Sequence, residues 1–344
     1  MAFRLRNGSR TSLAITALVI LGSVTVVTGA DAASAASNGC EVNGAPISGT
    51  RVNGTGGDDV IVCSAGVPLG TTVDGGAGAD TITVTGTPGS LSPDGLNPTI
   101  GDLGNGGTLS GGSGNDVITV TGGNGTTDIR GKASNGGTGN TGSIDGGDGD
   151  DRITVTGGTG GKTGGGVGGD GDSAGTVKGG PGRDIILVTG GAGGASETSD
   201  HRGHGATGAD SSMISGGPDA DVITVAGGDG APGPEGGFGG KAVIAYTVIS
   251  GDGGADVVTA IGGDGGPGED VGARGGEGMR LATLRGGDGD DELATYGGVG
   301  SGGVGRANAI YSGTLNGGAG NNTCRVEPKR ETIGTKKFLN CTLI

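Results

Sequence analysis

Short segments in which every second residue is aliphatic alternate along the chain with long segments that consist mainly of glycine. In a typical aliphatic segment, Ile153 and Val155 are separated by Thr154 and followed by Thr156. This strict alternation predicts a β-strand with one buried face and one outward face. A further aliphatic residue, Ile144, lies just before the glycine-rich turn that precedes the segment. Each unit therefore contributes about three inward side chains around one turn.

This unit recurs nine times in one direction along the chain. The first two copies are 21 residues apart, and later copies follow at intervals of 31 to 37 residues. A single copy cannot bury its aliphatic residues, whereas stacked copies form a continuous aliphatic ladder. The pattern therefore predicts an all-β fold, a parallel β-solenoid (β-roll or β-helix-like) with coils of about 35 residues and Gly-rich excursions. The sixth position of the turn is occupied in successive copies by Asp59, Asp80, Asp116, Asp151, Asp184, Asp221, Asp256, Asp291 and Asn322.

The composition supports a thin repeat structure. Glycine takes 92 of the 344 positions, Trp is absent, and there are only three Phe and three Tyr residues. Large aromatic side chains normally contribute much of the buried area of a globular core, so a wide core is hard to build from this chain. A disordered low-complexity chain has a similar composition, but it would not carry a periodic aliphatic ladder.

The glycine-rich excursions between copies are roughly 15 to 20 residues long, for example 157–175 and 262–278. Three arrangements are compatible with them: extra weak strands that complete a wide coil, close-packed polyglycine-type segments, or flexible loops. Because glycine loses the most conformational entropy on ordering, we expect partly ordered excursions beside a regular solenoid.

The N-terminus has the features of an export signal in residues 1–32. Arg4, Arg6 and Arg10 form a basic segment, residues 13–27 are mostly apolar, and residues 30–32 offer small side chains for cleavage. The apolar run is shorter than a comfortable membrane span of about 20 residues, and an uncleaved anchor is the alternative. We therefore expect a secreted, extracellular protein with no membrane span.

The four cysteines lie near the two ends of the mature chain. An even number in an exported protein predicts disulfides, and proximity favours the pairs Cys40–Cys63 and Cys324–Cys341. We expect the two bridges to close the ends of the solenoid. The predicted organisation is a signal peptide (1–32), an N-terminal disulfide cap with the first repeat (33–64), the solenoid repeats (65–322) and a C-terminal disulfide cap (323–344).

The formal net charge of −15 comes mainly from Asp residues inside the glycine-rich segments. An acidic chain of this kind argues against nucleic acid and anionic membranes as partners. It favours cations.

The turns themselves carry a specific motif. Five copies satisfy GGxGxD strictly, followed by x-aliphatic-x, and they end at Asp80, Asp116, Asp151, Asp184 and Asp291. This pattern resembles the hemolysin-type calcium-binding repeats of the RTX family. In that family a parallel β-roll places calcium between stacked turns, with ligands from turn carbonyls and the sixth-position Asp. The resemblance therefore implies Ca²⁺ as the cofactor, with Asp59, Asp80, Asp116, Asp151, Asp184, Asp221, Asp256 and Asp291 as its ligands.

The chain also departs from that family. The family's tandem repeats recur every nine residues and give two turn columns, whereas this chain has one turn per coil, which implies one calcium column at most. Thr55, Asp219 and Asp252 replace turn glycines, and Asn322 lacks a carboxylate, as expected of a terminal repeat. The chemistry nevertheless suits calcium, which takes six to eight hard oxygen ligands. Stacked carboxylates about 4.8 Å apart repel each other by roughly 1 kcal/mol even in water, and we expect calcium to relieve this repulsion.

The sequence contains no strong signal of catalysis. His201 and His204 have no third metal ligand nearby, so we interpret them as solvated loop histidines. A calcium-dependent polysaccharide lyase is the catalytic alternative, but it needs a base beside the metal and an aromatic sugar platform. Arg152 and Arg183 adjoin the Asp positions without forming such a site, and aromatic residues are almost absent. We predict that the protein is not an enzyme.

The outward strand positions suggest a second binding function. Three copies carry Thr-x-Thr at 83–85, 119–121 and 154–156, and stacking would arrange them as a flat array. Such an array resembles the ice-binding face of some solenoid antifreeze proteins. However, Thr is favoured at outward positions of any strand, and Leu187, Ala226 and Ile261 interrupt the pattern.

We predict a secreted calcium-binding repeat protein with a structural or surface-associated role. An ice- or surface-binding solenoid is the alternative, and a cell-surface or extracellular polymer is a further partner that the sequence does not identify.

Overall fold

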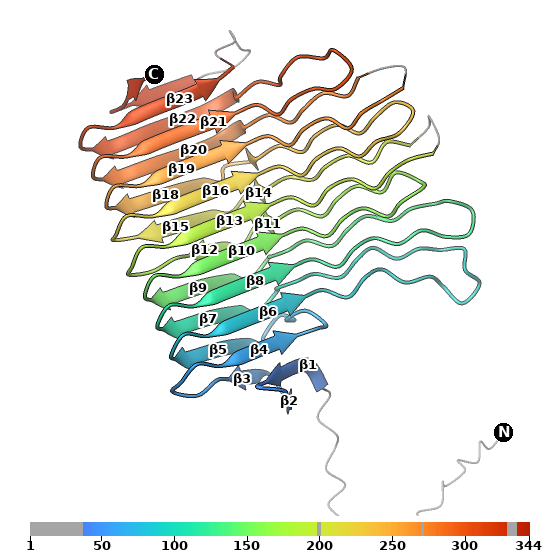
Figure 1. The fold of residues 1–344 in the computed structure, drawn as a ribbon, viewed down its shortest axis with the longest axis horizontal. Coiled ribbons are helices and arrows are strands. Elements are labelled where there is room, and N and C mark those ends of the chain that lie inside the picture. Colours follow the sequence, from blue (N-terminus) through green and yellow to red (C-terminus); the bar gives the residue numbers. More distant parts are fainter. Residues whose placement is uncertain (1–36, 198–200, 270–271, 329–335) are drawn as a thin grey trace, which may run out of the picture. The chain divides into compact units, whose positions relative to one another are not determined.

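The structure is a computed structural model that describes residues 37–197, 201–269, 272–328 and 336–344. The predicted signal peptide, residues 1–32, lies outside the described residues. Within them every regular element is a β-strand, and no helix is long and apolar enough to cross a membrane. The strands form two long sheets that run side by side along the stack of coils (Figure 1). The predicted parallel β-solenoid is confirmed.

The first sheet contains one strand from each coil, and all its pairs are parallel except those of β1. In spatial order its strands are β2 (Ala45–Ser48), β1 (Ser37–Val42), β4 (Val60–Cys63), β6 (Thr81–Thr85), β8 (Val117–Thr121), β10 (Arg152–Thr156), β13 (Ile185–Thr189), β16 (Val222–Ala226), β19 (Val257–Ile261), β21 (Glu292–Tyr296), β23 (Thr323–Glu327) and β25 (Thr342–Leu343).

The second sheet contains the strands that precede the turns, together with three short strands that lie further along the coil. The main strands are β3 (Arg51–Asn53), β5 (Thr72–Ala77), β7 (Thr108–Ser113), β9 (Ser143–Asp148), β12 (Thr176–Lys178), β15 (Met213–Gly217), β18 (Val248–Gly253), β20 (Met279–Asp288), β22 (Ile310–Ala319) and β24 (Lys336–Leu339). The short strands are β11 (Asp172–Ser173), β14 (Ala209–Asp210) and β17 (Val243–Ile244), and they pair in a row that joins β20.

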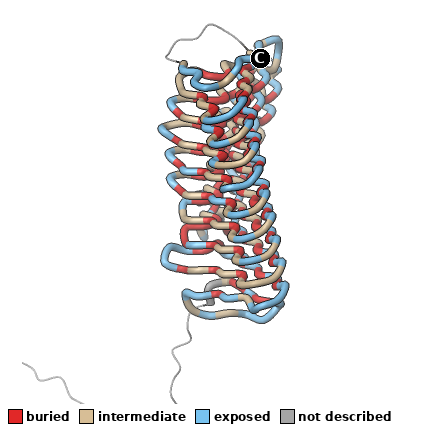
Figure 2. The backbone as a smooth tube through the Cα atoms, turned by 90° about the vertical axis from the view of Figure 1, so that its left-hand side faces the viewer, coloured by how far each residue is buried: buried red, intermediate tan, exposed pale blue. Residues whose placement is uncertain are grey.

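Equivalent residues of successive coils lie directly beside each other, so the aliphatic positions form straight columns. Ile153 pairs with Ile118 on one side and with Ile186 on the other. Figure 2 shows buried residues recurring at the same places in coil after coil. The predicted inward ladder is confirmed, because all its members are at most 3% exposed. With Cys63, Cys324 and Val326, which the structure adds, its three columns are Val52, Val73, Leu109, Ile144, Val177, Ile214, Ile249, Leu284 and Leu315; Ile61, Ile82, Ile118, Ile153, Ile186, Ile223, Val258, Leu293 and Cys324; and Cys63, Val84, Val120, Val155, Val188, Val225, Ala260, Thr295 and Val326.

The glycine-rich excursions run out from the first sheet and return to the second, on the side opposite the GGxGxD turns (Figure 1). We call their paired arms the glycine layer. Its outgoing legs are residues 86–89, 122–125, 157–161, 190–194, 227–231, 262–266 and 297–300. Its return legs are residues 101–104, 136–139, 166–171, 203–208, 237–242, 273–278 and 305–309.

The glycine layer is close-packed through main-chain hydrogen bonds. The Gly158 N–H donates to Gly137 O at 2.8 Å, the Gly169 N–H to Gly158 O at 2.8 Å, and the Gly191 N–H to Gly169 O at 2.7 Å. Outgoing and return legs therefore alternate across the layer, each bonded to legs of its own and of neighbouring coils. A Cβ on Gly158 would lie 2.0 Å from Gly123 O, so the legs pack at a distance that excludes side chains. Of the three arrangements open to the sequence, the structure has the close-packed polyglycine type, and the expectation of only partly ordered excursions is wrong for these legs.

Both predicted disulfides are confirmed. Cys40 and Cys63 face each other across the antiparallel pair of β1 and β4 at the first coil, with a Cα–Cα distance of 4.0 Å. Cys324 and Cys341 join β23 to the segment before β25 at the last coil. Each bridge thus ties an end segment to the outermost coil of the stack.

Candidate metal centre: a buried column of carboxyl groups

The GGxGxD turns stack because glycine occupies, in most copies, two positions that disfavour a side chain; Thr55, Asp219 and Asp252 are the exceptions. In the fourth copy, Gly147 and Gly149 have φ angles of 110° and 134°, a region that L-residues rarely adopt. A Cβ on Gly147 would also lie 1.9 Å from Gly112 O in the preceding turn. The turns therefore approach each other closely and direct the sixth-position side chain into the coil.

All eight predicted ligand residues are brought together in one buried column, each at most 2% exposed. In seven of the eight, one carboxylate oxygen links two coils, whereas Asp59 Oδ1 accepts from Asn43 Nδ2. The Asp116 N–H donates to Asp151 Oδ1 at 2.8 Å, and the Asp151 N–H donates to Asp184 Oδ1 at 2.8 Å. The same bond recurs along the column until the Asp291 N–H donates to Asn322 Oδ1 at 2.7 Å. The column comprises Asp59, Asp80, Asp116, Asp151, Asp184, Asp221, Asp256, Asp291 and, at its end, Asn322.

The second carboxylate oxygen, Oδ2, is buried without a hydrogen-bond partner in seven of these residues. Asp116 Oδ2 and Gly146 O lie 2.4 and 2.3 Å from the point where a Cβ on Gly111 would sit. Both acceptors face the same turn glycine, and a buried Oδ2 without a donor is costly, so a proton or a cation would offset this cost. The seven residues are Asp80, Asp116, Asp151, Asp184, Asp221, Asp256 and Asp291.

The two ends of the column show how these groups are satisfied when donors are present. At the first turn, Asp59 Oδ2 accepts hydrogen bonds from the N–H and the hydroxyl of Thr55, at 2.5 and 2.9 Å. The Thr55 N–H bond lowers the pKa of Asp59, against the effect of burial. At the last turn, Asn322 presents Nδ2 instead of a second oxygen, and Nδ2 donates to Asn340 O at 3.2 Å. An amide therefore replaces the carboxylate where the column ends.

In the middle of the column, the pKa values of the Asp carboxyl groups are raised instead of lowered. Burial raises the pKa of Asp151 and Asp256 to about 6, and that of Asp184 and Asp221 to about 7, with a further increase from neighbouring carboxylates. Each charged group in the middle has lost water and faces other acids. Without a bound cation, the central carboxyl groups therefore hold protons up to near-neutral pH.

The donor set of this column is made of oxygen alone. The stacked side chains contribute one unpartnered Oδ2 per coil, and within the described ranges no three His, Cys, Asp or Glu side chains converge on one point. A calcium shell of six to eight oxygens would therefore need turn carbonyls or water in addition to Oδ2. The hard-oxygen chemistry suits calcium and excludes the thiolate and imidazole ligands that softer metals prefer.

A second buried polar column was missed in the sequence. The Asn105 Nδ2 donates to Asn140 Oδ1 at 2.7 Å, and the Asn140 Nδ2 donates to Asp172 Oδ1 at 2.8 Å. Asp172 Oδ2 has no hydrogen-bond partner, and burial raises the pKa of Asp172 to about 6. A signal was present, because each of these residues lies four or five positions before the inward aliphatic residue of its coil.

The two histidines of the excursion lie in different surroundings. His201 is exposed, whereas the His204 ring stacks on Phe238 with a centroid distance of 4.9 Å, and His204 Nδ1 accepts the Phe238 N–H at 2.9 Å. The interpretation of His204 as a solvated loop histidine is therefore wrong. Burial, followed by the charge of Arg202, lowers the pKa of His204 and keeps its ring neutral.

Two comparisons with known proteins found no match. No family model matches the chain, and no curated protein matches it. The resemblance of the turns to hemolysin-type calcium-binding repeats therefore stays a prediction from the motif.

Proposed function

We propose that this chain is a secreted calcium-binding repeat protein with a structural or surface-associated role, and that calcium compensates the buried carboxyl column. One observation carries the proposal: seven consecutive coils each bury a carboxylate Oδ2 that has no donor, and in five of them a glycine carbonyl of the following coil approaches the same turn glycine. The proposal needs no catalytic group, and we propose none.

The electrostatics of the column explain why a cation would matter. Neighbouring carboxylates about 4.8 Å apart repel each other by roughly 1 kcal/mol in water and several-fold more at an effective dielectric constant near 20. Summed along the column, the repulsion is comparable to the net stability of a whole domain, about 5–15 kcal/mol. Binding of a divalent cation would therefore contribute directly to the free energy of folding. An affinity on the order of 10⁻⁴–10⁻³ M per site, as in other extracellular modules, would suit calcium levels outside the cell.

The decisive experiment compares two neighbouring carboxylates. Asp151→Asn keeps the acceptor for the Asp116 N–H but replaces Oδ2 by a donor, as Asn322 does naturally. Asp150→Asn removes the same charge from an exposed side chain that pairs with Arg183 at 3.3 Å. Calorimetric titration with calcium should show a lower stoichiometry for Asp151→Asn and an unchanged one for Asp150→Asn. Chelation should lower the melting temperature of the unaltered mature chain at pH 7.

Two outcomes contradict the proposal. One is a chelated protein that keeps its circular dichroism spectrum and melting temperature at pH 7. The other is an Asp151→Asn variant that binds as much calcium as the unaltered chain. In either case, protons rather than cations would satisfy the buried oxygens.

A second candidate function follows from the outward face of the first sheet. Thr83, Thr119 and Thr154 lie directly beside each other in register, and the row continues through Leu187, Thr224 and Thr259. Among the outward positions of β6 to β19, Arg152 carries the only charge, although the whole chain has a net charge of −15. Val117, Ile185 and Val222 on this face are 39 to 43% exposed.

A flat array of Thr and aliphatic side chains with a single charge favours adsorption to an ordered surface such as ice. Thermal hysteresis of the calcium-loaded protein, and its loss in Thr154→Tyr, would support this function. The absence of thermal hysteresis in the unaltered protein would remove it.

A further inference from the structure

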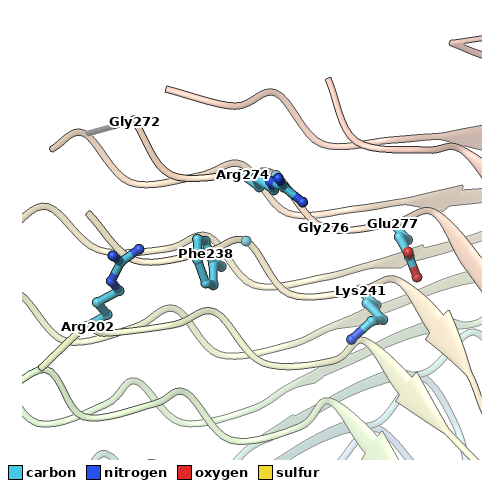
Figure 3. A pocket seen from close by; sticks show the side chains of 9 residues that line it. Arg202, Phe238, Lys241, Gly272, Arg274, Gly276 and Glu277 are labelled. Carbon is cyan, nitrogen blue, oxygen red and sulfur yellow. The ribbon is translucent and has the colours of Figure 1, made fainter. Parts of the chain in front are cut away.

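A hollow of about 440 Å³ lies on the return legs of three successive coils, in the glycine layer and therefore on the opposite side from the GGxGxD turns. Figure 3 shows Arg202, Phe238, Lys241, Arg274 and Glu277 along these legs. The remaining lining residues are glycines, so the floor of the hollow is main chain. It is independent of the carboxyl column.

Phe238 provides an aromatic surface that its neighbours hold in place. Its side chain is 40% exposed, the His204 ring stacks on it at an interplanar angle of 10°, and the Arg202 guanidinium lies 5.1 Å from its centroid. Main-chain bonds fix the adjacent legs, because the Gly205 N–H donates to Phe238 O and the Gly239 N–H donates to Arg274 O, both at 2.9 Å. A ring that is already ordered loses little entropy when a ligand packs on it.

Positive charge is concentrated here in an otherwise acidic chain. Arg202, Lys241 and Arg274 line the hollow, whereas Glu277 is the one carboxylate among its lining residues. Arg202 is paired with Glu235, and Glu277 with Arg280 at 3.5 Å. In the part of the chain that the structure describes, Lys241 and Arg274 have no ion-pair partner within 4.0 Å. These two cations are available to an anionic ligand.

The hollow continues along the axis of the solenoid. A second hollow of about 400 Å³ shares Arg274, Gly275 and Glu277 with the first and extends to Arg306 on the next return leg. One cation thus lies in each of four successive coils: Arg202, Lys241, Arg274 and Arg306. The cations are staggered across the groove: Arg274 lies beside Phe238 and Gly239 of the preceding leg, whereas Lys241 lies further along that leg, beside Glu277 (Figure 3). A ligand that reaches cations in several coils must be extended, which favours a polymer with repeated anionic groups over a single small ion.

We infer that this groove binds an extended acidic polysaccharide. Its carboxylates would pair with Lys241 and with Arg274, whose guanidinium group can bind a carboxylate in a bidentate manner. A sugar ring would pack on the exposed part of Phe238. The net charge of −15 would repel the denser charge of nucleic acid. This inference does not depend on calcium binding by the Asp column.

The test measures binding of polygalacturonate, a uronic acid polymer, to the mature chain by affinity electrophoresis and calorimetry in the presence of chelator. Chelator separates this site from calcium-mediated bridging. Binding is expected at low salt, and it should weaken as salt is added. The double variant Lys241→Ala/Arg274→Ala should weaken it at least tenfold, and Phe238→Ala should weaken it without a change of charge.

The matched control is Arg183→Ala, which removes an exposed cation from a GGxGxD turn on the other side of the molecule. It should bind polygalacturonate as the unaltered chain does, and all variants should keep the same melting temperature. Three results would overturn the inference: no binding of polygalacturonate at low salt, equal weakening by Arg183→Ala, or equally tight binding of single-stranded DNA.

Discussion

The two halves of each coil are ordered by opposite means. In the strand half, Ile153 and its equivalents fill a core with aliphatic side chains, and Asp151 and its equivalents bond the main chain of one coil to the next. In the glycine layer, the absence of side chains lets main-chain segments bond directly to several neighbours. The strand half should therefore respond to the loss of side-chain atoms and to protonation. The glycine layer should respond mainly to added atoms.

The largest expected effect concerns the pH dependence of the strand half in chelator. Burial raises the pKa of Asp184 and Asp221 from 3.8 to about 7. Between about pH 4 and pH 7, the folded state holds protons that the unfolded state has released, so stability falls as pH rises and is greatest below about pH 4. Urea denaturation of the chelated protein from pH 4 to pH 7.5 should show this decline, and calcium should reverse it at pH 7. A free energy of unfolding that stays flat over this range would contradict it.

The next effect separates the inward and outward faces of one strand. Ile153→Ala should lower the free energy of unfolding by about 2–5 kcal/mol, because it leaves a cavity in a fully packed column. Thr154→Ala, one residue further on the outward face, should change it by at most about 0.5 kcal/mol. Chemical denaturation of both variants provides the measurement. Equal effects would mean that the ladder does not form the core.

The corresponding test in the glycine layer adds a single methyl group. Gly158→Ala should cost about 1–3 kcal/mol, since its Cβ would lie 2.0 Å from Gly123 O. Gly56→Ala is the matched control, because a Cβ on Gly56 meets nothing within 4 Å. Thermal denaturation should separate the two variants. If both are neutral, the legs are not close-packed and behave as loops.

The smallest effect lies at the end of the carboxyl column. Asn322→Ala removes the acceptor of the Asp291 N–H and the donor to Asn340 O, and it should cost about 1 kcal/mol. Asn321→Ala, at the exposed neighbouring position, should have almost no effect. Hydrogen exchange of the Asp291 amide gives a direct measurement. Unchanged protection in Asn322→Ala would show that the last coil does not need this bond.

The strand half was predictable because its aliphatic and polar side chains recur with a regular period in the sequence. The recurrence of Ile153, Val155 and Ile144 at fixed positions determined the inward columns, the coil length and the parallel register. The two disulfides followed from the placement of four cysteines near the chain ends. The motif also placed all eight Asp residues in one column, since stacked copies must superimpose their sixth positions.

Only the tertiary structure determined the packing of the glycine layer, the hydrogen bonding of the buried Asp oxygens and the position of the groove around Phe238. A run of glycines has no side-chain pattern that would distinguish a loop from a close-packed leg. Close packing requires acceptor carbonyls on the neighbouring legs, such as those of Gly137 and Gly169. The hydrogen bonds of Asp151 likewise depend on contacts between coils, because its Oδ1 bonds a neighbouring coil while its Oδ2 is left without a donor. The groove around Phe238 combines residues from separate coils. Sequence determines what each coil repeats, whereas contacts between coils determine which groups are left to bind something else.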